Sequence, residues 1–94
     1  MLNMAVALSL RSTLLSVLPN HRSEASVLIK WPNDVVLWHA QTHRKCAGIL
    51  VENVWRGSEW THVVIGIGVN VSSQRLTRSY RAVSLLEAWQ VTIS

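Results

Sequence analysis

The chain of 94 residues is long enough for one small domain but too short to enclose a deep site by itself. Its hydrophobic share of 49% against 15% charged residues argues against intrinsic disorder, because enough apolar surface is present to offset the entropy of ordering. The net charge of +4 suits anionic ligands such as phosphates and carboxylates. The basic residues form no run and no helix-turn-helix pattern, so we expect no nucleic acid partner.

The cysteine content and the length of the apolar runs indicate the compartment in which we expect the protein. Cys46 is the single cysteine, which excludes an internal disulfide and makes a reducing compartment the default. Arg11 interrupts the longest apolar stretch, and no run reaches the roughly 18 residues that a membrane span requires. We therefore expect a cytoplasmic protein with no membrane partner. The lack of acidic residues before Glu24 is also typical of a transit peptide, which leaves a mitochondrion or plastid as the alternative.

The first element is an apolar helix. Met4, Leu8, Leu15 and Leu18 recur at helical spacing, and Pro19 ends the pattern, which favours a domain helix over a transit peptide. Residues 21–25 then form a polar connection. The next residues, 27–29, are an apolar run typical of a short strand, and this strand has Lys30 at its end.

A rigid corner and a hairpin follow. Pro32 keeps Trp31 out of the helical region and Asn33 favours a turn, so residues 30–34 predict a sharp corner between two extended segments. The second strand runs over residues 34–38. The polar stretch 39–44 predicts a longish hairpin loop, and residues 45–54 predict the third strand.

The clearest strand pattern covers residues 60–71, after a turn at 56–58. Apolar β-branched residues occupy one face, and Gly66, Gly68 and Asn70 occupy the other. A face with two glycines leaves bare backbone, which suits a flat ligand lying on the sheet. A polar loop follows as far as Arg81, and residues 82–89 indicate a short helix. Together the elements predict an α/β (α+β) fold in which an N-terminal helix packs on a mixed, largely antiparallel sheet.

Three sequence blocks carry a resemblance to a known family. In order, they are residues 30–35 (KWPNDV), 45–52 (KCAGILVE) and 65–71 (IGIGVNV). Their combination resembles the biotin protein ligases, over about residues 4–86, in the central segment of the catalytic domain. The resemblance implies a partial class II synthetase-like fold, with residues 1–94 as a partial biotin/lipoate ligase-type catalytic domain.

The resemblance also implies a two-step reaction. Biotin and ATP, with Mg²⁺, form biotinyl-5′-adenylate, and a lysine of a biotin-accepting carboxylase domain then attacks the activated acyl group. The family's upstream glycine- and arginine-rich loop and its C-terminal domain are absent, so we expect low activity in isolation and pairing with the missing ligase half or a second copy. The alternatives are a lipoate ligase-like protein and a non-catalytic truncated fragment.

The catalytic residues that the resemblance implies are three charged side chains. Lys45 matches the family lysine that touches both the carboxylate and the phosphate, where a cation removes the repulsion between two anions. Lys30 resembles the phosphate-facing lysine, with a salt bridge to Glu52 as the alternative. Asp34 is the expected Mg²⁺ ligand, because Mg²⁺ is usually bound by one or two carboxylates plus substrate oxygens. A plain turn aspartate is its alternative.

Five further residues are expected to bind biotin or the adenylate, together with Lys45. Gly48 would let the ligand approach the backbone, although a bulge glycine is its alternative. Gly66 and Gly68 would form the floor of the pocket. Asn70 offers an amide to ribose, phosphate or metal-bound water, and Asn33 is either a ligand contact or a turn residue.

Overall fold

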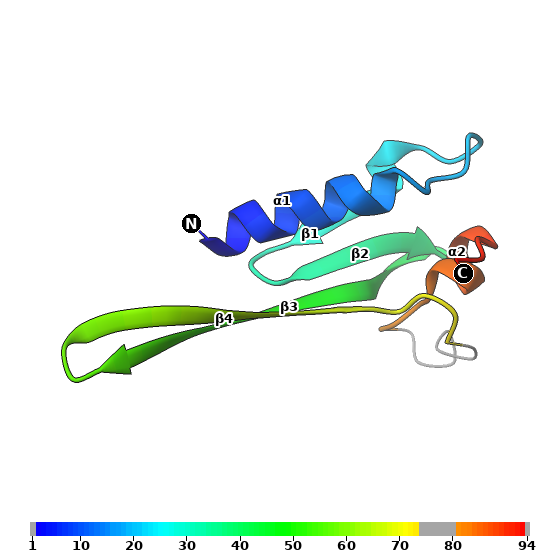
Figure 1. Ribbon diagram of the computed structural model, residues 1–94. Coiled ribbons are helices and arrows are strands. Elements are labelled where there is room, and N and C mark those ends of the chain that lie inside the picture. Colours follow the sequence, from blue (N-terminus) through cyan, green and yellow to red (C-terminus); the bar gives the residue numbers. More distant parts are fainter. Residues whose placement is uncertain (1, 74–80, 94) are drawn as a thin grey trace.

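The computed structural model describes residues 2–73 and 81–93, as an antiparallel sheet with a helix on one face (Figure 1). The sheet has the order β1-β2-β3-β4, and the predicted α+β class is confirmed. An isolated parallel bridge joins Lys45 to Ala82 beside it. In chain order the elements are α1 (Leu2–Leu15), the 3-10 helix η1 (Glu24–Ser26), β1 (Val27–Lys30), β2 (Asp34–His39), β3 (Thr42–Arg56), β4 (Glu59–Val69) and α2 (Leu85–Trp89).

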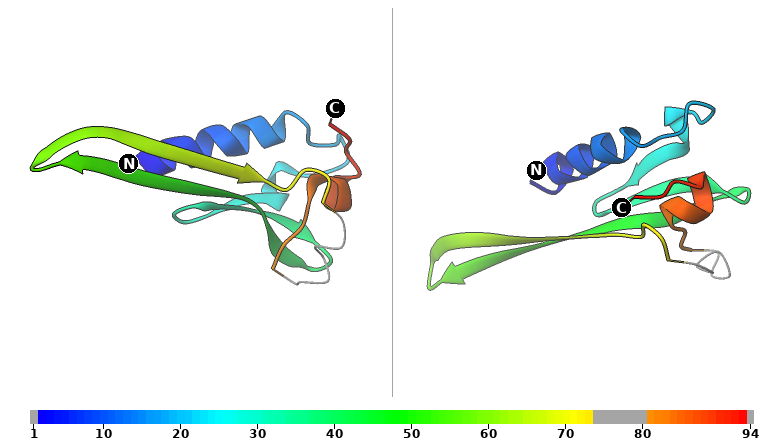
Figure 2. Two further views of the ribbon diagram at one scale, coloured as in Figure 1. Left: turned by 60° about the horizontal axis from the view of Figure 1, so that its bottom comes forward. Right: turned by 45° about the vertical axis from the view of Figure 1, so that its right-hand side comes forward.

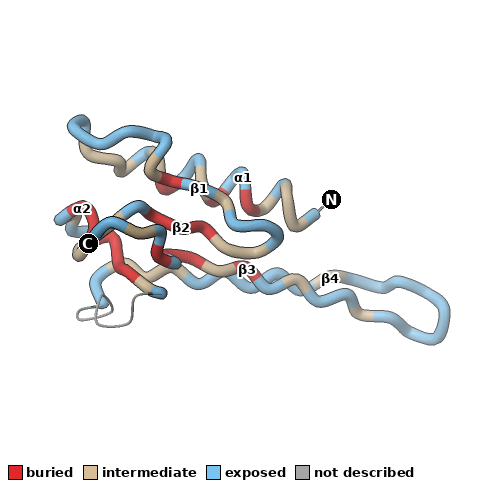
Figure 3. Tube along the Cα trace, turned by 180° about the vertical axis from the view of Figure 1, so that it is seen from behind, coloured by how far each residue is buried: buried red, intermediate tan, exposed pale blue. Residues whose placement is uncertain are grey.

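The core lies between α1, the inner face of the sheet and α2 (Figure 3). Alternate residues of the strands point into it, as the period of two requires. Its buried members are Ala7, Leu10 and Leu14 from α1; Val27, Val35, Leu37, Cys46, Ala47 and Ile49 from the strands; and Val83, Leu85, Ala88 and Trp89 near the C-terminus. None of the helices in the described ranges is long and apolar enough to cross a membrane.

The β3–β4 hairpin extends beyond the rest of the chain (Figures 1 and 2). Its turn contains Gly57 at a φ of 63°, a left-handed conformation that glycine adopts without a steric penalty. The hairpin makes the molecule elongated, with extents of 49 × 27 × 25 Å. Most of β4 is exposed, so its alternating pattern marks a strand without marking a buried face.

The loop between β2 and β3 corrects the sequence prediction. Only Ala40 and Gln41 connect the strands, with φ values of 51° and 64°, and His39 already pairs with Thr42. Two left-handed residues in succession make the tight turn that matches strand twist. The longish loop predicted over residues 39–44 is therefore wrong, because neither alanine nor glutamine signals a positive φ.

Other boundaries differ at the ends of the helices. After Leu15, three successive i−3 hydrogen bonds tighten the chain before Pro19. The C-terminal helix starts at Leu85 and not at residue 82, because Ser84 caps it in a reciprocal capping box with Glu87. Much of the polar loop predicted before Arg81, residues 74–80, lies outside the described residues.

A substitution in the core tests this packing. Leu37 is 0% exposed at the centre of β2, whereas Leu50 on β3 is 58% exposed. We expect Leu37→Ala to lower the free energy of unfolding by about 2 to 5 kcal/mol, because it removes buried methyl groups and leaves a cavity. Urea denaturation followed by circular dichroism measures this. Leu50→Ala is the matched control, and an equal loss in both variants would contradict the placement of the core.

Candidate functional site

A bulge in the β2–β3 pair decides which way the candidate site residues face. On β3, Ala47 and Lys45 pair with consecutive residues of β2, so Cys46 is an extra residue. In a regular strand Lys45 and Gly48, three positions apart, would face opposite sides of the sheet. The bulge instead brings both to the face that carries Asp34, opposite the core.

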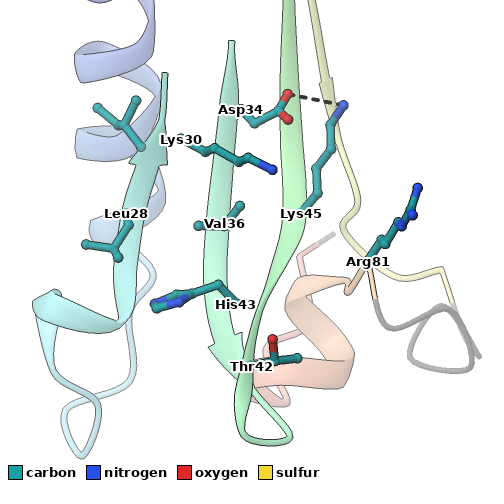
Figure 4. A pocket seen from close by; sticks show the side chains of 9 residues that line it. Leu28, Lys30, Asp34, Val36, Thr42, His43, Lys45 and Arg81 are labelled. Atoms are coloured by element: carbon teal, nitrogen blue, oxygen red, sulfur yellow. Dashed lines mark ion pairs between the residues drawn. The ribbon is translucent and has the colours of Figure 1, made fainter. Parts of the chain in front are cut away.

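Lys45 and Asp34 form an ion pair on this face (Figure 4). The distance from Lys45 Nζ to Asp34 Oδ1 is 3.2 Å, and the two side chains are 51% and 31% exposed. The pair is thus accessible to a ligand. An exposed ion pair contributes little to stability, because water screens it and holding two side chains costs entropy.

Gly48 provides the space in which Lys45 lies. A Cβ at Gly48 would be 2.9 Å from Lys45 Cε, 3.0 Å from Lys45 Nζ and 3.8 Å from Asp34 Oδ1. The lysine side chain therefore lies across the backbone at Gly48 toward the aspartate. In this structure Gly48 makes room for a protein side chain, which is a more specific role than the predicted approach of a ligand to the backbone.

The predicted glycine floor has an open surface. Gly68 pairs directly with Gly48, and Gly66 pairs with Leu50. A Cβ at Gly68 would meet no atom within 4 Å. A pocket of about 320 Å³ lies here, lined by Lys45, Cys46, Ala47, Gly48, Gly68, Val69 and Asn70. Four of the predicted site residues thus meet in one hollow.

The two asparagines bond mainly within the protein. Asn33 Oδ1 accepts a hydrogen bond of 2.7 Å from Asn3 Nδ2 at the start of α1, and the Asn33 carbonyl accepts one from the Ile49 amide. Asn33 is therefore held at the corner, where the structure supports its reading as a turn residue. The Asn70 amide lies 3.4 Å from the carbonyls of Lys45 and Val83, just after β4 ends. It lines the hollow, but it also joins three chain segments.

A second pocket of about 770 Å³ lies on the same sheet face and holds the charged residues (Figure 4). It is lined by Leu28, Ile29, Lys30, Asp34, Val36, Thr42, His43, Lys45 and Arg81. Lys30 pairs with Asp34 across β1 and β2, so both side chains share this face. Glu52, the alternative partner of Lys30, pairs with Val64 farther along the long hairpin.

Sequence reasoning missed Arg81 and His43 as residues of this pocket. His43 lies two positions before Lys45 and so on its face, which a prediction of the tight β2–β3 turn would have shown. Arg81 is far along the chain and reaches the pocket because residues 81–83 run beside β3 at Lys45. No local pattern in the sequence predicts the pairing of residues 81–83 with β3.

Cys46 does not contribute reactive chemistry. Its side chain is buried, and burial raises the pKa of the thiol to about 11, an effect partly offset by a hydrogen bond to the Asn70 carbonyl. The S–H group donates to that oxygen at 3.6 Å. At neutral pH the thiol stays protonated and acts as a small core residue.

The position of Lys45 over Gly48 generates a prediction. Gly48→Ala must displace the lysine side chain and weaken its ion pair with Asp34, whereas Gly68→Ala adds its methyl group to open space. Lys30 and Lys45 are the only lysines, so acetylation followed by mass spectrometry reports both. We expect Gly48→Ala to raise Lys45 acetylation up to about fivefold, the limit for an exposed ion pair. Equal rates in both variants would contradict the contact.

Comparison with known proteins identifies the family. The model of the biotin/lipoate A/B protein ligase family matches residues 1–70, which include nearly all of the three sequence blocks. The bifunctional ligase/repressor BirA of Escherichia coli (strain K12) is 42% identical over 53 residues, 56% of this chain and 15% of the relative. BirA of Salmonella typhimurium is 42% identical over 50 residues, 53% of this chain and 14% of the relative.

The chain thus matches only about one seventh of the length of these curated relatives. The family match nevertheless covers well over half of the chain and agrees with the resemblance in the sequence blocks. The chain belongs to the biotin/lipoate A/B protein ligase family.

Proposed function

We propose that this chain provides the adenylate-binding part of a biotin protein ligase, which activates biotin with ATP and transfers it to a carrier lysine. The observation that carries the proposal is the Lys45–Asp34 pair at the border between a cationic pocket and a bare glycine floor. A cation in that position touches both anions of an acyl-activation reaction. Membership of the ligase family supports the same reading.

The first step joins two anions. An oxygen of the biotin carboxylate attacks the α-phosphorus of ATP, a new O–P bond forms, and pyrophosphate leaves with the electrons of the broken P–O bond. Lys45 lines both pockets and therefore suits the junction of carboxylate and phosphate. Its ammonium reduces the repulsion on approach and stabilises charge at the phosphorus. Lys30 adds a second cation on the phosphate side.

Asp34 fits a magnesium ion only together with the substrate. No group of three His, Cys, Asp or Glu side chains able to hold a metal exists among the described residues. One carboxylate plus phosphate oxygens is, however, a usual Mg²⁺ environment. Asp34 is the residue that would hold such an ion, which would neutralise phosphate charge.

The second step transfers the acyl group. The amine of a lysine on a carboxylase carrier domain attacks the acyl carbon, the C–O bond to the phosphate breaks, AMP leaves, and the new amide nitrogen loses its proton. The backbone at Gly66 and Gly68, next to Gly48 with the Lys45 side chain over it, gives the biotin ring a floor that has Lys45 at its border. The intermediate is held by both of its ends, so its acyl carbon is fixed in position for attack.

Biotin is favoured over lipoate by local sequence. Trp31 and Pro32 before Asn33, and the block Ala47 to Leu50, resemble biotin ligases more closely than lipoate ligases. ATP–pyrophosphate exchange with each acid distinguishes them. The assay is run on the chain alone and on the chain mixed with the segment that precedes the matched residues in the Escherichia coli relative. Exchange with lipoate but not biotin would overturn the proposal.

A second candidate is association without catalysis. An apolar groove of about 530 Å³ lies between α1 and β4, where Ile65 and Ile67 are 40% and 53% exposed. Exposed apolar residues on an edge strand favour pairing with another polypeptide, either another part of a ligase or a second copy. Detection of a complex by light scattering would favour this candidate if neither the chain alone nor its mixture with the upstream segment showed ATP–pyrophosphate exchange.

The mechanism predicts a large effect at Lys45. We expect Lys45→Ala to lower the exchange rate about 100-fold or more, because removal of one group that stabilises the transition state typically costs that much. Arg56→Ala is the matched control, since it removes one positive charge at the exposed hairpin turn. Both rates are measured at saturating biotin and ATP. Unchanged exchange in Lys45→Ala would remove this residue from the mechanism.

A further inference from the structure

We propose that Arg81 binds the β- and γ-phosphates of ATP, and hence pyrophosphate, and makes no contact with the acyl substrate. The inference rests on the proposed function, because it assigns the two pockets of that site to the two substrates. The cationic pocket, lined by Lys30, Lys45 and Arg81, would take the triphosphate. The glycine pocket would take the acyl group.

The residues that line the two pockets indicate a different ligand for each pocket. Lys45 lines both, while Arg81 and Lys30 line only the larger one. Among the described lining residues, the larger pocket has three cations and one carboxylate, Asp34, so it favours a ligand with several negative charges. Among the described residues that line the smaller pocket, Lys45 is the only charged one, which matches a single carboxylate at the end of an apolar acyl group.

The size of the pockets agrees with this division. At about 770 Å³ and 320 Å³, both fall within or near the usual range for small-molecule sites. A nucleoside triphosphate is larger than biotin and needs the larger space. The shared position of Lys45 then lies where the carboxylate meets the α-phosphate.

The backbone fixes Arg81 beside Lys45. The Lys45 amide donates to the Arg81 carbonyl at 2.7 Å, and the Val83 amide donates to the Lys45 carbonyl at 3.0 Å. These bonds hold both residues in one rigid pairing. Figure 4 shows Lys30 and Arg81 on opposite sides of the Lys45–Asp34 pair. Lys45 and Arg81 also line the same pocket, so a phosphate chain in it has both side chains beside it.

Arginine suits this role by its chemistry. Its planar guanidinium binds two phosphate oxygens at once and keeps its charge at all physiological pH values. The phosphate of the acyl-adenylate carries a single negative charge, which Lys45 already matches. The additional cation is thus needed for ATP and the leaving pyrophosphate more than for the intermediate.

The test measures binding of inorganic pyrophosphate, ATP and biotin to the full chain by calorimetry. We expect Arg81→Ala to weaken pyrophosphate and ATP about tenfold, as for the loss of a charged hydrogen bond, and to leave biotin within twofold. Arg81→Lys should recover part of the loss. Arg56→Ala, which removes the same charge about 36 Å away along β3, should change none of the affinities.

A reciprocal variant tests the other pocket. Gly68→Val adds its side chain to open space in the glycine pocket, so it should weaken biotin without affecting pyrophosphate. Circular dichroism verifies that each variant is folded. Equal loss of biotin and pyrophosphate in Arg81→Ala, or no loss of pyrophosphate, would overturn the inference and leave the proposed function standing. A wild-type chain that binds pyrophosphate but not biotin, even when mixed with the segment that precedes the matched residues in the Escherichia coli relative, would instead contradict the proposed function.

Discussion

The candidate site depends on one extra residue in β3. Cys46 has no partner position on β2, and this bulge turns Lys45 to the face that carries Asp34 and Gly48. Without it, the period of two would direct the lysine into the core, where an unpaired ammonium is very costly. The bulge is stabilised from behind, because the Asn70 amide donates to the Cys46 carbonyl at 2.8 Å and the thiol donates to the Asn70 carbonyl. A buried cysteine thus keeps a surface lysine in place.

Much of the fold follows from local sequence. The helical spacing before Pro19, the corner at Trp31 and Pro32, and the alternation over residues 60–71 each predict the element that the structure contains. The turn at Ala40 and Gln41 could not be predicted in this way, because its positive φ values come from the twist of the strands and not from the type of residue. The position of Arg81 is equally hidden. It depends on a bridge between Lys45 and Ala82, two residues 37 positions apart.

The candidate site, too, could be predicted only in part from local sequence, because some of its contacts join distant segments of the chain. The blocks around Lys30, Asp34 and Lys45 identify the charged residues, and the structure gathers these three in one pocket. What the blocks do not reveal is how each residue is used. Gly48 gives space to a side chain, Asn33 is bonded to Asn3, and Asn70 bonds to backbone carbonyls. These contacts result from packing between segments that are far apart in the chain, and local sequence patterns do not reveal such packing.

The ion pair between Lys45 and Asp34 has a thermodynamic consequence. An anion that takes the lysine ammonium from Asp34 must first break a contact at 3.2 Å, so the first ligand to arrive bears that cost and the second does not. Any such saving is reciprocal, since each ligand must help the other by the same factor. For the proposed acyl and nucleotide substrates, one lysine shared by two hollows is therefore a source of cooperative binding that requires no movement of the sheet.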